Sequence, residues 1–318
     1  MCYNDAVGGS RARVAFENRP SNVACYCSVL ARFSVIVTRG KHMATSSRVS
    51  ESRLSQGYQV LEHEPYYLAG GDEIDVFSRC HGRGLPVMLK GPTGCGKTRF
   101  VEHMAWKLNR PLVTIACHDD LSASDLTGRY IIRGDEAVWV DGPLTTAVRI
   151  GAICYLDEVV EARQDTIVVI HPLSDDRRIL PIEKTGELVQ AAEGFQLVIS
   201  YNPGYQHAIK DLKPSTRQRF VTLTFDFPTA TAEVEIVRHE SGVKPAVAKA
   251  LVELGHRLRH LKEQGLAEVP GTRLLVSAAR LINDGISPAD ACRSAIIGPL
   301  TDDLDLAAAM DDLVAATL

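Results

Sequence analysis

A glycine-rich segment at residues 91–98 has the pattern of a phosphate-binding loop. It reads Gly-Pro-Thr-Gly-Cys-Gly-Lys-Thr, which fits G-x-x-x-x-G-K-[ST]. Glycines let backbone N–H groups turn toward phosphate oxygens, the Lys97 ammonium can reach the β- and γ-phosphates, and the Thr98 hydroxyl can ligate Mg²⁺. We therefore expect ATP and Mg²⁺ as cofactors. The residues expected to contact them are Gly91, Pro92, Thr93, Gly94, Cys95, Gly96, Lys97 and Thr98.

An adjacent pair of carboxylates follows an apolar run at residues 152–156. Asp157 is placed to hold Mg²⁺, directly or through water, and Glu158 is placed to polarise a water for attack on the γ-phosphate. An Asp-Glu pair can also serve as the acidic start of a helix. The phosphate-binding pattern about sixty residues earlier favours the catalytic interpretation.

These groups need a scaffold that brings distant segments together, and the apolar runs predict a parallel sheet. Continuous apolar strands separated by helices are typical of a sheet covered on both faces. Residues 97–108 have helical spacing of apolar side chains. The five expected strands are residues 85–90, 111–117, 152–156, 194–200 and 219–225.

Helices dominate the chain after Pro228, with apolar residues spaced by three and four at residues 247–260 and 272–283. The fold class is therefore α/β, a three-layer αβα nucleotide-binding core at residues 65–228 followed by a smaller all-α lid at 229–318. Two segments read as strand, turn and strand, at residues 130–140 and 178–190. They predict two β-hairpin insertions in the core.

The beginning of the chain differs in charge from the rest. Residues 1–42 carry six basic and two acidic side chains, whereas the whole chain has a net charge of −4. We interpret residues 1–42 as a disordered leader or a start assigned upstream of Met43, and 43–64 as an N-terminal arm. The acidic balance argues against a nucleic-acid partner. No apolar run is long enough to cross a membrane, and the eight cysteines form no Cys-x-x-Cys pair. These features favour a reduced, cytoplasmic protein without membrane insertion.

Taken together, the motifs resemble those of an AAA+ ATPase of the MoxR branch, in the CbbQ/NirQ/NorQ group. The resemblance extends from about residue 64 to the C-terminus. It rests on Gly91–Thr98, Leu156-Asp-Glu158 and Ser200-Tyr-Asn202-Pro-Gly. It is supported by the strings at residues 89–98, 124–129, 156–163 and 213–220.

The resemblance implies roles for four further residues. Asn202 would be sensor 1, holding the attacking water or a phosphate oxygen, although Asn-Pro-Gly is also a turn signal. Arg217 or Arg219, with Arg219 slightly favoured, would be an arginine finger acting on a neighbouring subunit's nucleotide; a solvated basic patch is the alternative. Arg273 would be sensor 2 at a helix start, or else an exposed helix arginine.

The resemblance also implies a Mg²⁺-dependent ATPase that works as a ring, expected to be a homo-hexamer. Its partners would be a von Willebrand factor A domain adaptor, CbbO- or NorD-like, and a client enzyme. Rubisco activation is favoured, with maturation of nitric oxide or nitrite reductase as the alternative. A nucleotide-gated binding module with little turnover is an alternative of another class, against which the intact Glu158 argues. Acidic residues near the hairpin turns, Asp135, Glu136, Glu183 and Glu187, are expected to meet the adaptor.

Overall fold

The computed structural model describes residues 57–203, 212–261 and 268–318. The interpreted leader at 1–42 and residues 43–56 of the arm lie outside the described residues. All the described residues belong to one unit of the chain.

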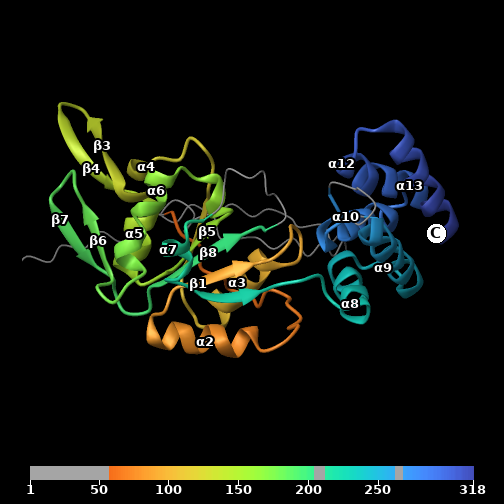
Figure 1. Ribbon diagram of the computed structural model, residues 1–318, viewed down its shortest axis with the longest axis horizontal. Coiled ribbons are helices and arrows are strands. Elements are labelled where there is room, and N and C mark those ends of the chain that lie inside the picture. Colours follow the sequence, from red (N-terminus) through yellow and green to blue (C-terminus); the bar gives the residue numbers. More distant parts are fainter. Residues whose placement is uncertain (1–56, 204–211, 262–267) are drawn as a thin grey trace, which may run out of the picture. The chain divides into compact units, whose positions relative to one another are not determined.

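A five-stranded parallel sheet forms the centre of the core (Figure 1), and its strand order is β2-β5-β8-β1-β9. This confirms the predicted α/β fold class with a parallel sheet. β8 is the middle strand and lies between β5 and β1, so the loop after β1 lies at the same edge of the sheet as the carboxyl ends of β8 and β5. The strands are β1 Val87–Lys90, β2 Leu112–Ala116, β5 Ile153–Asp157, β8 Gln196–Tyr201 and β9 Val221–Thr224.

Both faces of the sheet are buried. Successive side chains of a strand point to opposite faces, and each face packs in a different apolar cluster. Val87 and Leu89 of β1 pack with Phe100 of α3 in one cluster, whereas Met88 packs with Leu144 of α5 in another. The helices of the core are α2 Glu73–Arg83, α3 Lys97–Lys107, α4 Ala123–Thr127, α5 Pro143–Ile150, α6 Gln164–Val168 and α7 Pro214–Arg217, with 3₁₀ turns η1 Val159–Glu161 and η2 His171–Leu173.

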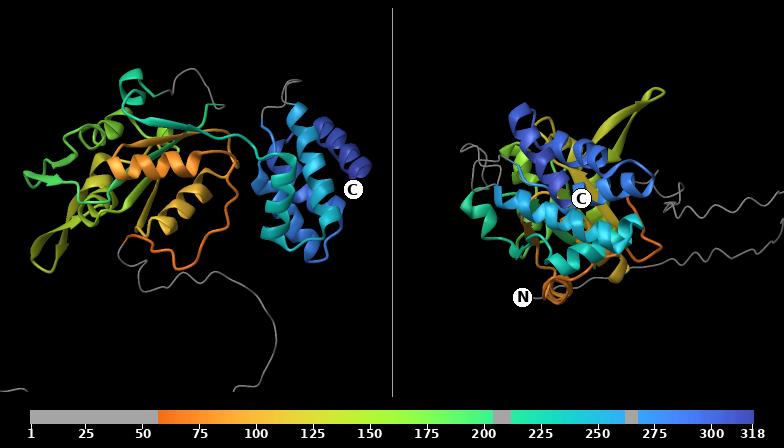
Figure 2. Two further views of the ribbon diagram at one scale, coloured as in Figure 1. Left: turned by 90° about the horizontal axis from the view of Figure 1, so that it is seen from below. Right: turned by 90° about the vertical axis from the view of Figure 1, so that its right-hand side faces the viewer.

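Two antiparallel hairpins extend from the core, as the strand-turn-strand patterns predict. Strand β3 (Gly128–Arg133) pairs with β4 (Glu136–Asp141), and β6 (Ile179–Ile182) pairs with β7 (Glu187–Gln190). Figures 1 and 2 show both hairpins at the same end of the core. Trp139 packs edge-on against Tyr130, with ring centroids 5.2 Å apart, and donates to Asp141 Oδ1 at 2.7 Å. This tryptophan therefore stabilises its own hairpin.

The C-terminal helices enclose a second apolar core, as expected for the all-α lid (Figure 2). Val237, Leu254, Leu275 and Met310 are fully buried in it. Helix α10 has the bounds predicted from its periodicity. The elements are α8 Ala230–Ser241, α9 Pro245–His260, α10 Thr272–Asn283, α11 Pro288–Cys292, the π-helical turn η4 Arg293–Ile297, α12 Gly298–Leu300 and α13 Leu304–Thr317.

Candidate functional site

The glycine-rich loop joins β1 to α3, which begins at Lys97. Gly94 and Gly96 have φ angles of 75° and 101°, so a left-handed backbone requires glycine there. A Cβ at Gly91 would lie 2.5 Å from the carbonyl oxygen of Phe225. The loop can therefore take this path only with these glycines, and its strand–loop–helix context is that of a phosphate site.

Lys97 is nearly buried, and its ammonium donates to the carbonyl oxygens of Gly91 and Pro92, both at 2.8 Å. Burial lowers the pKa of this ammonium, while the nearby carboxylates of Asp157 and Glu158 oppose the shift. The cation and the two acidic residues therefore belong to one electrostatic neighbourhood, although they lie on different segments.

Asp157 ends β5, and its Oδ1 atom accepts two hydrogen bonds of 2.6 Å, from the Tyr155 hydroxyl and from the Ser200 hydroxyl. The backbone N–H of Glu158 donates to the same Ser200 oxygen at 2.6 Å. Glu158 has a φ angle of 55°, which is uncommon for a residue other than glycine. Asp157 and Glu158 line the same pocket as Lys97 and Thr98.

Asn202 lies directly after β8, the neighbour of the Asp157 strand. Its Nδ2 atom donates to Thr93 Oγ1 at 2.5 Å, so the amide reaches the phosphate loop. The Oδ1 atom of Asn202 is buried and accepts no hydrogen bond from any residue that the structure describes. The structure thus places the expected sensor 1 residue at the loop with one unused acceptor.

Arg273 occupies the first turn of α10, where the lid meets the phosphate loop. A Cβ on the preceding Gly271 would lie 2.8 Å from the Thr93 carbonyl oxygen and 2.9 Å from the Gly94 Cα. Arg273 is exposed, lines the pocket and contributes to lowering the pKa of Lys97 after the larger effect of burial. The expected sensor 2 residue therefore faces the same site.

The pocket between these groups has a volume of about 1080 Å³, enough for a nucleotide. The hard oxygen atoms of Thr98 and Asp157 fit Mg²⁺. The other wall of the pocket is apolar and suited to a purine base, and it was not predicted from the sequence. That wall depends on side chains brought together only by the fold, and the spacing of the sequence carries no signal for it. It includes Leu68, Val76, Phe227, Pro228 and Ile236.

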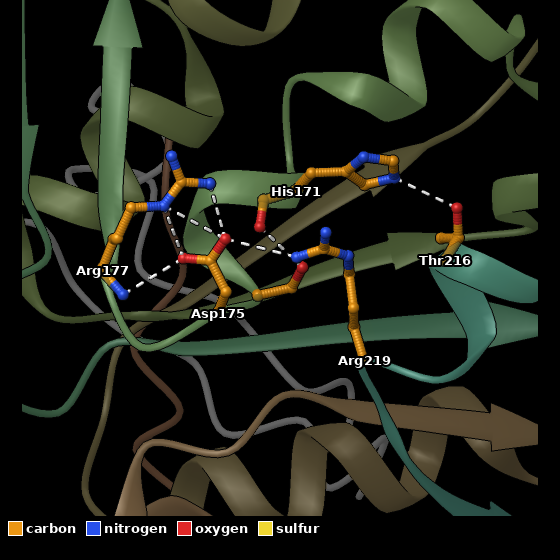
Figure 3. A network of polar contacts seen from close by, with 6 residues as sticks. His171, Asp175, Arg177, Thr216 and Arg219 are labelled. Carbon is orange, nitrogen blue, oxygen red and sulfur yellow. Dashed lines mark hydrogen bonds and ion pairs between the residues drawn. The ribbon is translucent and has the colours of Figure 1, made fainter.

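The two candidate finger arginines lie away from this pocket. Arg217 ends α7 and Arg219 lies just before β9, and neither is among the described residues that line the pocket of its own chain. Figure 3 shows Arg219 beside Asp175, with Arg219 Nη1 at 3.3 Å from Asp175 Oδ2. Arg177 contacts the same carboxylate at 2.6 Å, and its hydrogen bonds are the main cause that lowers the pKa of Asp175 to about 2.

Three further observations concern the second hairpin, metal-binding groups and membrane spans. The Glu187 carboxylate of the second hairpin binds both terminal nitrogens of Arg149, at 2.6 and 2.8 Å, so this acid is already paired within the chain. Across residues 57–203, 212–261 and 268–318, no three His, Cys, Asp or Glu side chains gather as a metal-binding group. In the same ranges, no helix has the length and apolar character needed to cross a membrane.

Comparison with known proteins agrees with this geometry. A family model described as AAA domain (dynein-related subfamily) matches residues 86–220, and one described as CbbQ/NirQ/NorQ C-terminal matches residues 233–317. Protein CbbQ of Hydrogenophilus thermoluteolus is 62% identical over 78% of this chain and 92% of its own. Protein NorQ of Paracoccus denitrificans is 60% identical over 79% of this chain and 93% of its own. The denitrification regulatory protein NirQ of Pseudomonas aeruginosa is 60% identical over 79% of this chain and 96% of its own. The chain belongs to the CbbQ/NirQ/NorQ family of MoxR-type AAA+ proteins.

Proposed function

We propose that this protein hydrolyses ATP in a Mg²⁺-dependent reaction and uses the energy to remodel or activate a client enzyme. The observation that carries the proposal is the convergence of Lys97, Asp157, Glu158 and Asn202 on one pocket, although they come from the start of α3 and the ends of β5 and β8. A cation, two carboxylates and an amide at one phosphate site are the groups that phosphoryl transfer to water requires.

Lys97 would bind the β- and γ-phosphates by exchanging its bonds to the Gly91 and Pro92 carbonyls for phosphate oxygens. Thr98 and Asp157 would hold Mg²⁺, which supplies charge neutralisation to the phosphates when bound. The apolar wall around Val76 and Phe227 would receive the adenine base. Substrate binding is thereby divided between a polar and an apolar half of the pocket.

Glu158 would accept a proton from the water that attacks the γ-phosphorus, and Asn202 would orient that water or a phosphate oxygen. The Oδ1 atom of Asn202 supports this role, because it has no partner within the described ranges and is an acceptor suited to a water molecule. Arg273 would add positive charge at the γ-phosphate from the lid side.

Hydrolysis would require an arginine from a second subunit, and we propose a ring, expected to be a hexamer. Arg219 and Arg217 lie outside the pocket of their own chain, which supports an action on a neighbour's nucleotide. A guanidinium brought in by a neighbour stabilises the charge that develops on the transferred phosphoryl group. Turnover would then depend on assembly.

Among clients, we favour Rubisco, reached through a von Willebrand factor A domain adaptor, with nitric oxide or nitrite reductase as the alternative. The relatives named CbbQ, NorQ and NirQ are 62, 60 and 60% identical, so identity alone does not separate the clients. The proposed setting for this work is the cytoplasm.

The experiment has two arms. ATP hydrolysis by the purified protein is measured with Mg²⁺ and with EDTA, and we expect turnover only with Mg²⁺. The ring is then incubated with its adaptor and either inhibited Rubisco or immature nitric oxide reductase, and recovery of client activity is followed. Recovery with ATP, and none with the Lys97→Ala ring, identifies the client; absence of Mg²⁺-dependent turnover would refute the ATPase proposal.

A further inference from the structure

Two buried hydroxyl groups, Tyr155 and Ser200, contact the acidic pair beneath the pocket. Tyr155 lies in β5 and is fully buried, and Ser200 lies in β8 with 1% of its surface exposed. Ser200 lines the pocket wall, whereas Tyr155 lies behind it. Neither residue is among those expected from the sequence to carry out the reaction.

Both hydroxyls are directed at the same carboxylate oxygen. Asp157 Oδ1 accepts from Tyr155 and from Ser200, each at 2.6 Å. Two short bonds from neutral donors to an ionised acceptor are strong and directional. They leave Oδ2 as the oxygen of Asp157 that can face a metal ion or its water. The protein therefore determines how this carboxylate is turned.

The Ser200 hydroxyl also connects Asp157 to Glu158. A hydroxyl has one proton and two lone pairs; here the proton goes to Asp157, and one lone pair accepts the Glu158 backbone N–H at 2.6 Å. Glu158 has a left-handed backbone with φ of 55°, which tertiary contacts must hold in place. Ser200 thus fixes the backbone from which the Glu158 carboxylate projects.

One chain of hydrogen bonds therefore connects Tyr155, Asp157, Ser200 and the Glu158 backbone.

We propose that Tyr155 and Ser200 are positioning residues of the metal and water site. Tyr155 aligns Asp157, one of the residues expected to hold Mg²⁺. Ser200 aligns Asp157 with Glu158, so that the residue expected to hold the metal and the residue expected to activate the water keep a fixed position relative to each other. This inference rests on the proposed function, because it assigns partners to the groups that would carry out hydrolysis.

The test measures nucleotide affinity as well as turnover. Binding of a fluorescent ADP analogue to the full chain is titrated in EDTA and in Mg²⁺, for the wild type and for Tyr155→Phe, Ser200→Ala and Ser200→Thr. We expect Tyr155→Phe and Ser200→Ala to bind normally in EDTA but to need about 10-fold more Mg²⁺. Ser200→Ala should also lower kcat by about 10- to 100-fold, and Ser200→Thr should restore part of it. Tyr130→Phe, on the exposed hairpin, is the control for loss of a phenol hydroxyl.

The outcomes separate this inference from the proposed function. Asp157→Asn should abolish the Mg²⁺ effect on binding; if it does not, the metal assignment itself fails. If Asp157→Asn abolishes the effect while Tyr155→Phe and Ser200→Ala retain the wild-type Mg²⁺ dependence, Asp157 holds the metal without their help and the inference is overturned. Thermal melting curves show whether each variant is folded before its binding is compared.

Discussion

Arg259 and Glu233 form a two-bond ion pair inside the lid, with contacts of 2.6 and 2.8 Å between helices α9 and α8. The Glu233 side chain is fully buried and also accepts from Thr272 Oγ1 at 2.6 Å. The Arg259 guanidinium lies 4.0 Å from the centre of the Phe227 ring, at the pocket wall, and its Nε donates to the Pro270 carbonyl. The pair and its contacts therefore connect the start of α8, the end of α9 and the start of α10. In α10, Arg273 directly follows Thr272.

Removing one partner of this pair should destabilise the lid strongly. Arg259→Ala would leave a buried carboxylate without its cation, and we expect it to lower the free energy of unfolding by about 3–5 kcal/mol. Arg257→Ala is the matched control, because its pair with Glu253 is about half exposed and should contribute less than about 1 kcal/mol. Urea unfolding of both variants measures the difference. Equal urea midpoints for the two variants would show that the buried pair contributes no more to stability than the exposed pair.

Lys97 and Glu158 should separate nucleotide binding from hydrolysis. Lys97→Ala removes the only lysine that lines the described part of the pocket, so ATP binding should be lost. Glu158→Gln retains the shape of the side chain but cannot accept a proton, so it should bind ATP and slow turnover by about 100-fold or more. Isothermal titration and a phosphate-release assay measure the two effects. Hydrolysis near the wild-type rate in Glu158→Gln would refute its role as the base.

Arg219 or Arg217 should act on the nucleotide of a neighbouring subunit. Arg219→Ala should bind nucleotide but turn over about 1000-fold more slowly, and the same measurement on Arg217→Ala decides between the two arginines. Mixing the inactive variant with Lys97→Ala subunits should recover some hydrolysis, because a mixed interface combines an intact loop with an intact finger. Arg177→Ala, which alters the same Asp175 cluster without removing either candidate, is the control. Mixed rings without any recovery would argue against action between subunits.

Local patterns made the elements predictable, but not the contacts between them. Helix α10 was predictable because Pro270-Gly271 marks its start and its apolar residues repeat at helical spacing. The phosphate loop and the Asp157-Glu158 pair were predictable because their chemistry resides in adjacent residues. The Ser200 bond to Asp157 was not, because it depends on β8 lying beside β5 across 43 residues of sequence. The apolar wall formed by Val76 and Ile236 likewise exists only after the lid packs.

The first hairpin should be needed for coupling to the adaptor but not for basal hydrolysis. Its turn at residues 133–136 is exposed, and Ile132 beside it is 83% exposed, so this tip can meet a partner without disturbing the core. The second hairpin is a weaker candidate than its acidic residues suggest, because Glu187 is held by Arg149. Replacing residues 133–136 by a Gly-Ser turn should therefore abolish stimulation of ATP turnover by adaptor and client, while turnover of the ring alone stays at the wild-type level.

The control for that prediction is Glu187→Gln, which alters the second hairpin by removing one charge from its pair with Arg149. We expect it to retain most of the adaptor stimulation, since its carboxylate is engaged within the chain. Phosphate release is measured for both variants with the ring alone, with adaptor, and with adaptor plus client. Full stimulation after replacement of the 133–136 turn would show that the adaptor binds elsewhere. Loss of stimulation in Glu187→Gln alone would show that the adaptor binds the second hairpin. The Glu187 carboxylate would then have to exchange Arg149 for a group of the adaptor.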